Sequence, residues 1–166
     1  MISSHARTLI LCVVTALVAT AFSGCATSGD AFAPAASVPE GKALIYVYRN
    51  GALHGAVFTP TVTFGNAVKI PLSVSGYYPY VAPAGPILIR ITSVGTRSFT
   101  LDAKAGETYY VRGGLVVMAA GFPALGQVPA AEALAELKNC RRISTSSPVT
   151  AADAAAPAPA ASTPAV

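Results

Sequence analysis

Short runs of β-branched and aromatic residues, each ended by a turn of Gly, Asn or Pro, recur along most of the chain. Spacing of about 8–12 residues between such runs is typical of antiparallel sandwiches. No stretch of helical periodicity separates the runs, so a parallel βαβ arrangement is not expected. The sequence therefore predicts a mainly β protein, a compact antiparallel β-sandwich. The predicted strands are 43–49, 58–64, 67–72, 77–81, 87–91, 98–101 and 108–118.

Three local patterns refine this prediction. Gly65-Asn66 lies between two short runs and predicts a hairpin. Ile87, Ile89 and Ile91 alternate with other residues and belong on one face of a strand. Gly113-Gly114 interrupts the last run and predicts a bulge or a bend.

One short helix is expected at the C-terminal end of the sandwich, over residues 129–139. Pro129 suits the first turn of a helix, and Lys138 suits the negative end of the helix dipole. The apolar residues at helical spacing are Ala130, Ala133, Leu134 and Leu137.

Residues 1–24 resemble an export signal. Arg7 precedes the apolar run 9–22, and small residues follow it. The alternative is a spanning helix, which needs about 20 apolar residues. The polar stretch that begins at Ser23 comes too early for that. We therefore expect a lipoprotein signal peptide over residues 1–24.

The end of this signal resembles a lipobox, where diacylglycerol is attached to a cysteine before cleavage in front of it. Ser23-Gly24-Cys25 fits the pattern, whereas Phe22 departs from the aliphatic residue that the pattern prefers. Ordinary cleavage after Ala33 is the alternative, but Pro34 follows at once and disfavours it. We expect lipidation of Cys25 and, since two or three acyl chains hold stably, a permanent anchor in the lipid bilayer.

Composition divides the rest of the chain into three parts. Residues 25–39 are rich in Ala, Ser, Gly and Pro and are predicted to be a flexible tether. Residues 40–143 have the length of one domain and hold the sandwich. Residues 144–166 form an Ala/Pro-rich tail that is predicted to be disordered. Ala26 differs from the Asp of an inner-membrane retention signal, so we expect an outer-membrane lipoprotein that faces the periplasm.

Charge excludes a nucleic-acid partner. Loss of Arg7 with the signal takes the 11 basic residues to 10, against 7 acidic ones. Only Arg141-Arg142 are adjacent, and no basic stripe with interleaved aromatics is present.

Catalytic, metal and cofactor sites are not expected. After the signal the chain has one histidine, His54, and one cysteine besides Cys25, Cys140. A metal needs three or four ligands brought together, and Asp102 and Glu107 flank a predicted turn. Cations next to Cys140 would favour its thiolate; the preferred alternative is a partly buried structural residue at the end of the helix.

The tyrosines are the best candidates for a binding site. Tyr46 and Tyr48 must share a face of one strand, as must Tyr78 and Tyr80. An exposed double-tyrosine face would stack on a glycan or a protein. The alternative, which is preferred, is that these rings cover a core.

Two phrases, ALIYVYR at 43–49 and AGETYYVR at 105–112, support a family resemblance. With the lipobox before them, and with YPYV at 78–81 between them, the chain resembles the bacterial lipoproteins grouped as domain of unknown function 2846. It is also distantly similar to PEGA and transthyretin-like sandwich domains. The likeness covers about residues 41–137 and departs over 55–72, where the hairpin is kept but the acidic residue of the family's hairpin is missing. The resemblance implies a fold and an envelope location, and it implies no activity.

Three functional hypotheses follow. The first is a non-catalytic, membrane-anchored envelope lipoprotein that binds another envelope protein. The second is a binding module for cell-wall glycan such as peptidoglycan. The third, an enzyme that uses His54 or Cys140, is disfavoured.

Overall fold

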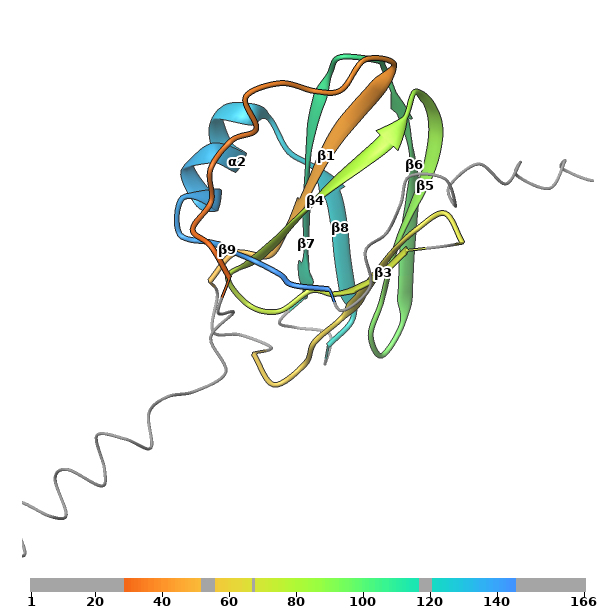
Figure 1. The fold of residues 1–166 in the computed structure, drawn as a ribbon. Coiled ribbons are helices and arrows are strands. Elements are labelled where there is room, and N and C mark those ends of the chain that lie inside the picture. The colour runs from red at the N-terminus through yellow and green to blue at the C-terminus, as the bar shows by residue number, and fades with distance from the viewer. Residues whose placement is uncertain (1–28, 52–55, 67, 117–120, 146–166) are drawn as a thin grey trace, which may run out of the picture.

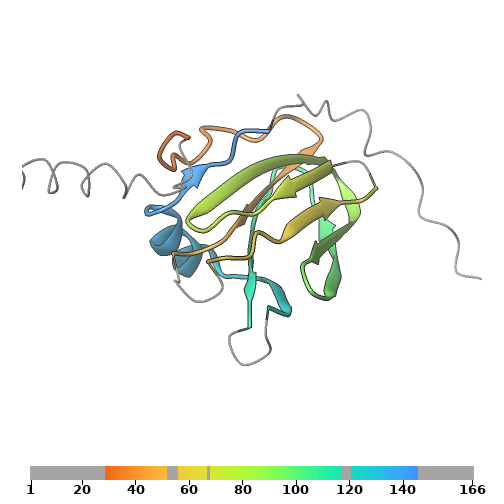
Figure 2. The ribbon, with the colours of Figure 1, turned by 90° about the horizontal axis from the view of Figure 1, so that it is seen from below.

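A computed structural model describes residues 29–51, 56–66, 68–116 and 121–145. The predicted signal peptide, Cys25, His54 and the tail beyond residue 145 lie outside this part. The described residues form two stacked β-sheets with one helix, α2 (Ala130–Leu137), to one side (Figures 1 and 2). The predicted mainly β sandwich with one short C-terminal helix is confirmed.

The larger sheet is built around a central strand. Its strands are β1 (Lys42–Tyr48), β4 (Gly76–Pro83), β7 (Thr108–Leu115), β8 (Pro123–Gln127) and β9 (Arg141–Arg142). Their order is β8-β7-β1-β4-β9. β1 pairs antiparallel with β4 and parallel with β7, and β9 pairs parallel with β4. The parallel pair β1–β7 needs no crossover helix, because the chain between these strands also forms the second sheet.

The second sheet is entirely antiparallel. Its strands are β2 (Thr61–Phe64), β3 (Val68–Pro71), β5 (Gly85–Thr92) and β6 (Thr96–Ala103), in the order β3-β2-β5-β6. The predicted hairpin is present, because Phe64 of β2 faces Val68 of β3 and Gly65 between them has a φ of 55°. The alternating isoleucines of β5 share one face, as predicted, and all three are buried between the sheets.

β1 is buried on both faces, and this explains its unbroken apolar sequence. Ala43, Ile45 and Val47 point into the core between the two sheets. Leu44, Tyr46 and Tyr48 point outward into a second cluster. Helix α2 contributes Ala133 and Leu137 to that second cluster. Period-two alternation along one strand thus supplies two separate cores.

Element boundaries differ from the predictions by a few residues. The strand predicted over 58–64 begins at Thr61, and the one predicted over 108–118 ends at Leu115. Helix α2 has Pro129 at its N-cap and Lys138 at its C-cap.

The prediction of a bulge at Gly113-Gly114 is wrong. β7 pairs with β8 without interruption, and Gly113 faces Leu125 while Gly114 faces Ala124. A Cβ atom on Gly113 would lie 2.6 Å from Cδ2 of Leu72 and 3.2 Å from Cδ1 of Ile91. Glycine at position 113 therefore makes room for side chains of the core.

The flexible tether predicted over 25–39 is wrong for residues 29–39. Phe32 packs edge-on against Tyr46 and Tyr77, with ring centroids 5.3 and 5.1 Å apart. The Phe32 amide donates to the Cys140 carbonyl at 3.2 Å, and the Ala35 amide donates to the Tyr46 hydroxyl at 2.8 Å. Contacts with aromatic residues from later strands therefore hold residues 29–39 on the domain, although the composition of this segment alone would not make it fold.

Candidate functional site

The four tyrosines of the predicted binding face point to opposite sides of the larger sheet. The register pairs Ile45 with Tyr80 and Tyr46 with Pro79, so each tyrosine pair shares a face but the two pairs do not. Tyr46 and Tyr48 lie under residues 29–39 and α2 and are 3% and 0% exposed.

Tyr78 and Tyr80 point toward the other side of the sheet. Tyr80 is 4% exposed in the core between the sheets, where its ring stacks on Phe64 at 4.2 Å. Tyr78 is partly buried against the same core. The four residues therefore form no common exposed face. Their preferred interpretation, as rings that cover a core, agrees with this burial.

A polar cluster that the sequence patterns did not predict connects β1, β7 and α2. The Tyr48 hydroxyl donates to Oε2 of Glu136 at 2.5 Å, and Nδ2 of Asn50 donates to Oε1 at 3.2 Å. The Arg112 guanidinium forms ion pairs with Glu136 at 3.1 Å and with Glu132 at 2.7 Å. The only sequence signal is the spacing of the two glutamates, which places both on one side of the helix.

Electrostatics fixes the ionisation of this cluster. Burial raises the pKa of Glu136, but hydrogen bonds from Tyr48 and Asn50 and the charge of Arg112 outweigh it, so the pKa lies below its ordinary value. Burial, and then the neighbouring Glu136 carboxylate, raise the pKa of Tyr48. At neutral pH the carboxylate is therefore charged and the hydroxyl is neutral. The charged Glu136 carboxylate and the neutral Tyr48 hydroxyl are therefore suited to holding α2 on the larger sheet.

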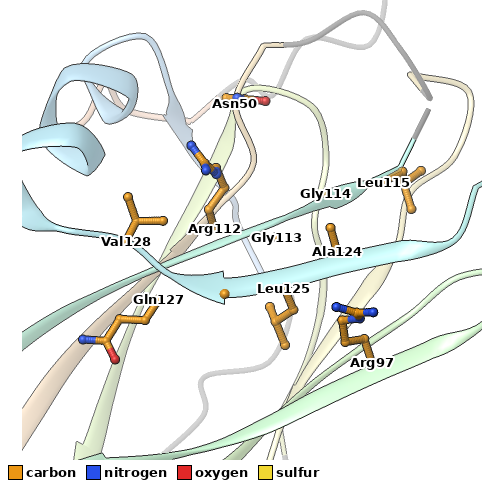
Figure 3. Close-up of a pocket in the computed structure, with 11 residues that line it drawn as sticks. Asn50, Arg97, Arg112, Gly113, Gly114, Leu115, Ala124, Leu125, Gln127 and Val128 are labelled. Carbon is orange, nitrogen blue, oxygen red and sulfur yellow. The ribbon is translucent and has the colours of Figure 1, made fainter. Parts of the chain in front are cut away.

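A groove of about 350 Å³ opens beside the cluster, along β7 and β8 (Figure 3). Arg97 of β6 lies on one side of β8 in this view, and Asn50 and Arg112 lie on the other. Gly114 and Gly126 leave space along its floor, since no side chain fills it there. The described residues that line the groove include no acid, histidine, cysteine or hydroxyl. The groove is thus equipped to bind polar or anionic groups.

The other residues with candidate chemistry have structural surroundings. Cys140 is 2% exposed, with Sγ 3.6 Å from the Arg49 carbonyl oxygen. Burial raises the pKa of its thiol to about 11. The neighbouring cations therefore do not produce a thiolate, and the residue is more deeply buried than predicted.

Asp102 and Glu107 flank the turn between β6 and β7, as predicted. The Tyr109 hydroxyl donates to Glu107 at 2.6 Å, and this bond raises the pKa of Tyr109. Across the described ranges, no group of three His, Cys, Asp or Glu side chains is placed to hold a metal ion.

The N-terminal segment joins the domain at one end of the strands. The Arg142 amide donates to the Asp30 carbonyl at 2.8 Å, and Ala31 forms a β-bridge with Arg141. We call this end, where β1 and β7 finish and β9 lies, the N-terminal pole; it is the lower end in Figure 1. Cys25, the predicted lipidation site, precedes Gly29 by four residues and lies outside the described part.

Comparisons with known proteins give no relative. No family model, curated protein or solved structure matches the chain. Within the ranges that the structure describes, no helix has the length and apolar character that crossing a membrane requires.

Proposed function

We propose that this chain is a non-catalytic lipoprotein of the bacterial cell envelope, anchored by acylated Cys25, whose sandwich is a protein-interaction module. The observation that supports the proposal most directly is the short distance along the chain between Cys25 and the docked segment. Gly29 lies four positions after Cys25, and an extended chain of that length spans at most about 14 Å. A lipid on Cys25 would therefore hold the domain close to the bilayer.

The proposal of a non-catalytic role rests on how the reactive groups of the described residues are used. Glu136 accepts hydrogen bonds from Tyr48 and Asn50, and Cys140 is buried as a thiol. A catalytic nucleophile or base needs access to substrate and a pKa suited to its task. Neither Glu136 nor Cys140 combines access to substrate with a pKa suited to catalysis.

For the partner, the groove along β7 and β8 favours a protein over a glycan. It presents the polar side chains of Arg97, Asn50 and Gln127 together with the apolar side chain of Leu125. Glycan recognition would need exposed aromatic rings for stacking, and Tyr46, Tyr48 and Tyr80 are buried. The glycan-binding alternative therefore loses the feature that motivated it.

Membership of the family called domain of unknown function 2846 is part of the same proposal. The two phrases that support the resemblance form β1 and β7, which are neighbours at the centre of the larger sheet. The family pattern would thus describe the centre of this fold.

Two experiments test the proposed function. Mass spectrometry of the mature N-terminus should find acylated Cys25 in the native chain, and Cys25→Ser should abolish both acylation and membrane retention. A photo-crosslinking residue at Gln127, which is exposed in the groove, should capture an envelope protein in intact cells. The matched control is Thr100, which is exposed on β6 outside the groove lining. Equal yields from both positions, or retention on purified peptidoglycan at low salt, would contradict the protein-binding proposal.

A further inference from the structure

Apolar side chains gather in solvent at the N-terminal pole. They come from three separate connections, β1–β2, β5–β6 and β7–β8. The exposed fractions are 88% for Val57, 41% for Phe58, 61% for Val94, 43% for Val116 and 52% for Phe122. We call these five residues the apolar rim. Exposed apolar patches on a small domain mark surfaces that contact another molecule.

The apolar rim is continuous across the three connections. A Cβ atom on Gly95 would lie 3.1 Å from the Phe122 ring, so Phe122 covers the β5–β6 turn. A Cβ atom on Gly121 would lie 3.3 Å from Val94 and 3.6 Å from the ring of Phe58. The three connections are therefore in contact and present one surface.

Two hydrogen bonds hold the rim in place from inside the domain. The buried Arg49 guanidinium donates to the Phe58 carbonyl at 2.7 Å. The Val116 amide donates to the Phe122 carbonyl at 2.8 Å and closes the β7–β8 connection. The apolar side chains are thus presented to solvent by a fixed backbone, and the fold does not turn them inward.

The rim lies at the pole that the N-terminal segment enters. Tyr48, at the end of β1, pairs with Tyr77 of β4, which pairs with Arg142 of β9. β7 runs parallel to β1, so it also finishes at this pole, and Val116 follows directly (Figure 1). Any lipid attached four residues before Gly29 would be on this side of the domain.

Charge distinguishes the two poles. Exposed Arg97, Arg141 and Arg142 lie at the N-terminal pole, together with the exposed Asp30. Arg112 at the same end is neutralised by its ion pairs with Glu132 and Glu136. The opposite pole carries the exposed acids Glu40, Asp102 and Glu107, with Lys104 among them. Anionic headgroups attract exposed basic side chains next to a membrane contact. Basic residues near an exposed apolar surface are the usual composition of an interfacial membrane contact.

We propose that the apolar rim is a second membrane contact, which enters the headgroup–acyl boundary of the bilayer that holds Cys25. This proposal rests on the lipid anchor of the proposed function. Gly29 lies four positions after Cys25, so an extended chain keeps it within about 14 Å of the anchored cysteine. The pole that Gly29 joins, which carries the rim, therefore faces the anchoring bilayer. The domain then sits upright on the membrane, with the groove along β7 and β8 at its side.

Tryptophan fluorescence tests this proposal directly, because the chain contains no tryptophan. Phe122→Trp places a fluorophore in the rim, and Val94→Trp provides an independent second position. Ala84→Trp, at an exposed residue of the opposite pole, is the matched control. The purified lipidated full-length chains are reconstituted into vesicles of phosphatidylethanolamine and phosphatidylglycerol whose acyl chains carry bromine. Thermal unfolding establishes that each variant is folded.

The expected result is a shift of the Phe122→Trp and Val94→Trp emission to shorter wavelength, with most of the intensity quenched. The tryptophan of Ala84→Trp should emit at the longer wavelength of a tryptophan exposed to water. If both rim positions behave like Ala84→Trp while the chain carries acylated Cys25 and floats with the vesicles, the membrane contact is disproved and the anchor stands. If Cys25 is not acylated, the proposed function itself fails. A shift that grows with protein concentration in detergent, without quenching by bromolipid, would assign the rim to a second copy and overturn the proposal.

Discussion

The Tyr48 hydroxyl donates a 2.5 Å hydrogen bond to Glu136, across 88 positions of sequence. Tyr48 is fully buried at the end of the central strand β1, and Glu136 stands in the last turn of α2. This contact fixes the helix on the outer face of the larger sheet. Tyr48 and Leu137 belong to the same outer apolar cluster.

Replacement of Glu136 by glutamine should destabilise the domain. The buried Tyr48 hydroxyl would keep only a neutral acceptor, and the ion pair between Arg112 and residue 136 would be lost. Hydrogen bonds to charged groups contribute about 1.5–3 kcal/mol, and we expect Glu136→Gln to lower the free energy of unfolding in urea by that amount. Glu132→Gln, whose side chain is 51% exposed, should cost less than about 1 kcal/mol. Equal losses in the two variants would contradict the role given to Tyr48.

The same contact predicts a pH dependence of stability. The pKa of Glu136 in the folded chain lies below the ordinary value of 4.5. Its stabilisation is therefore present above about pH 4.5 and is lost as the pH falls through the lowered pKa. The stability difference between the native chain and Glu136→Gln should be constant near neutral pH and should narrow below about pH 4.5. Urea unfolding over that range measures it, and a difference independent of pH would contradict the assignment.

Alanine should destabilise the domain at Gly113 and leave its stability almost unchanged at the adjacent Gly114. A methyl group on Gly113 would meet Leu72 at 2.6 Å in the core, whereas one on Gly114 would meet nothing within 4 Å. Overpacking of a core costs about 1–3 kcal/mol, so Gly113→Ala should lower the midpoint of thermal unfolding. Gly114→Ala should stay within about 0.5 kcal/mol of the native chain. Similar midpoints for the two variants would show that glycine at 113 is not needed for packing.

Cys140 should be unreactive in the folded chain. Its thiol is 2% exposed, and burial raises its pKa from 9.0 to about 11. That change alone leaves about 100-fold less thiolate at neutral pH. Alkylation of residue 140, followed by peptide mass spectrometry, should be at least that much slower than alkylation of a cysteine placed at the exposed Ala84. The two rates should converge in urea; comparable rates in the folded state would mean that Cys140 is accessible.

Phe32 should control the docking of residues 29–39. Its ring makes two edge-to-face contacts, with Tyr46 and Tyr77, and such pairs contribute about 0.5–1.5 kcal/mol each. Phe32→Ala should therefore speed hydrogen exchange of the Ala35 amide, which donates to Tyr46. Phe122→Ala removes the same ring from an exposed position and should leave that exchange rate unchanged. Unchanged exchange in Phe32→Ala would show that other contacts dock the segment.

Much of the fold could be predicted because its signals are local. The alternation of Ile87, Ile89 and Ile91 made one face of β5 apolar, and Gly65-Asn66 fitted the turn between β2 and β3. The helix at 130–137 followed from apolar spacing after Pro129. Each of these signals acts between residues that are close in sequence, so composition and periodicity are enough to detect it.

The candidate site could not be predicted in the same way. Alternation placed Tyr46 with Tyr48, and Tyr78 with Tyr80, but it could not say which face each pair would take. The pairing of β1 with β4 decided that, and it sent the two pairs to opposite sides of the sheet. The apolar rim could not be predicted from the sequence either, because Phe58, Val94 and Phe122 come together only where three connections meet.

The amino-acid sequence by itself determined the mainly β class, the isoleucine face of β5, the β2–β3 hairpin and the single short helix, because these depend on neighbours within a few residues. Only the tertiary structure decided that β1 and β7 run side by side in parallel, that residues 29–39 dock on Tyr46, and that Gly113 makes room for Leu72. These outcomes depend on strand order and register. Both are set by contacts between segments far apart in the chain, where no local pattern records the partner.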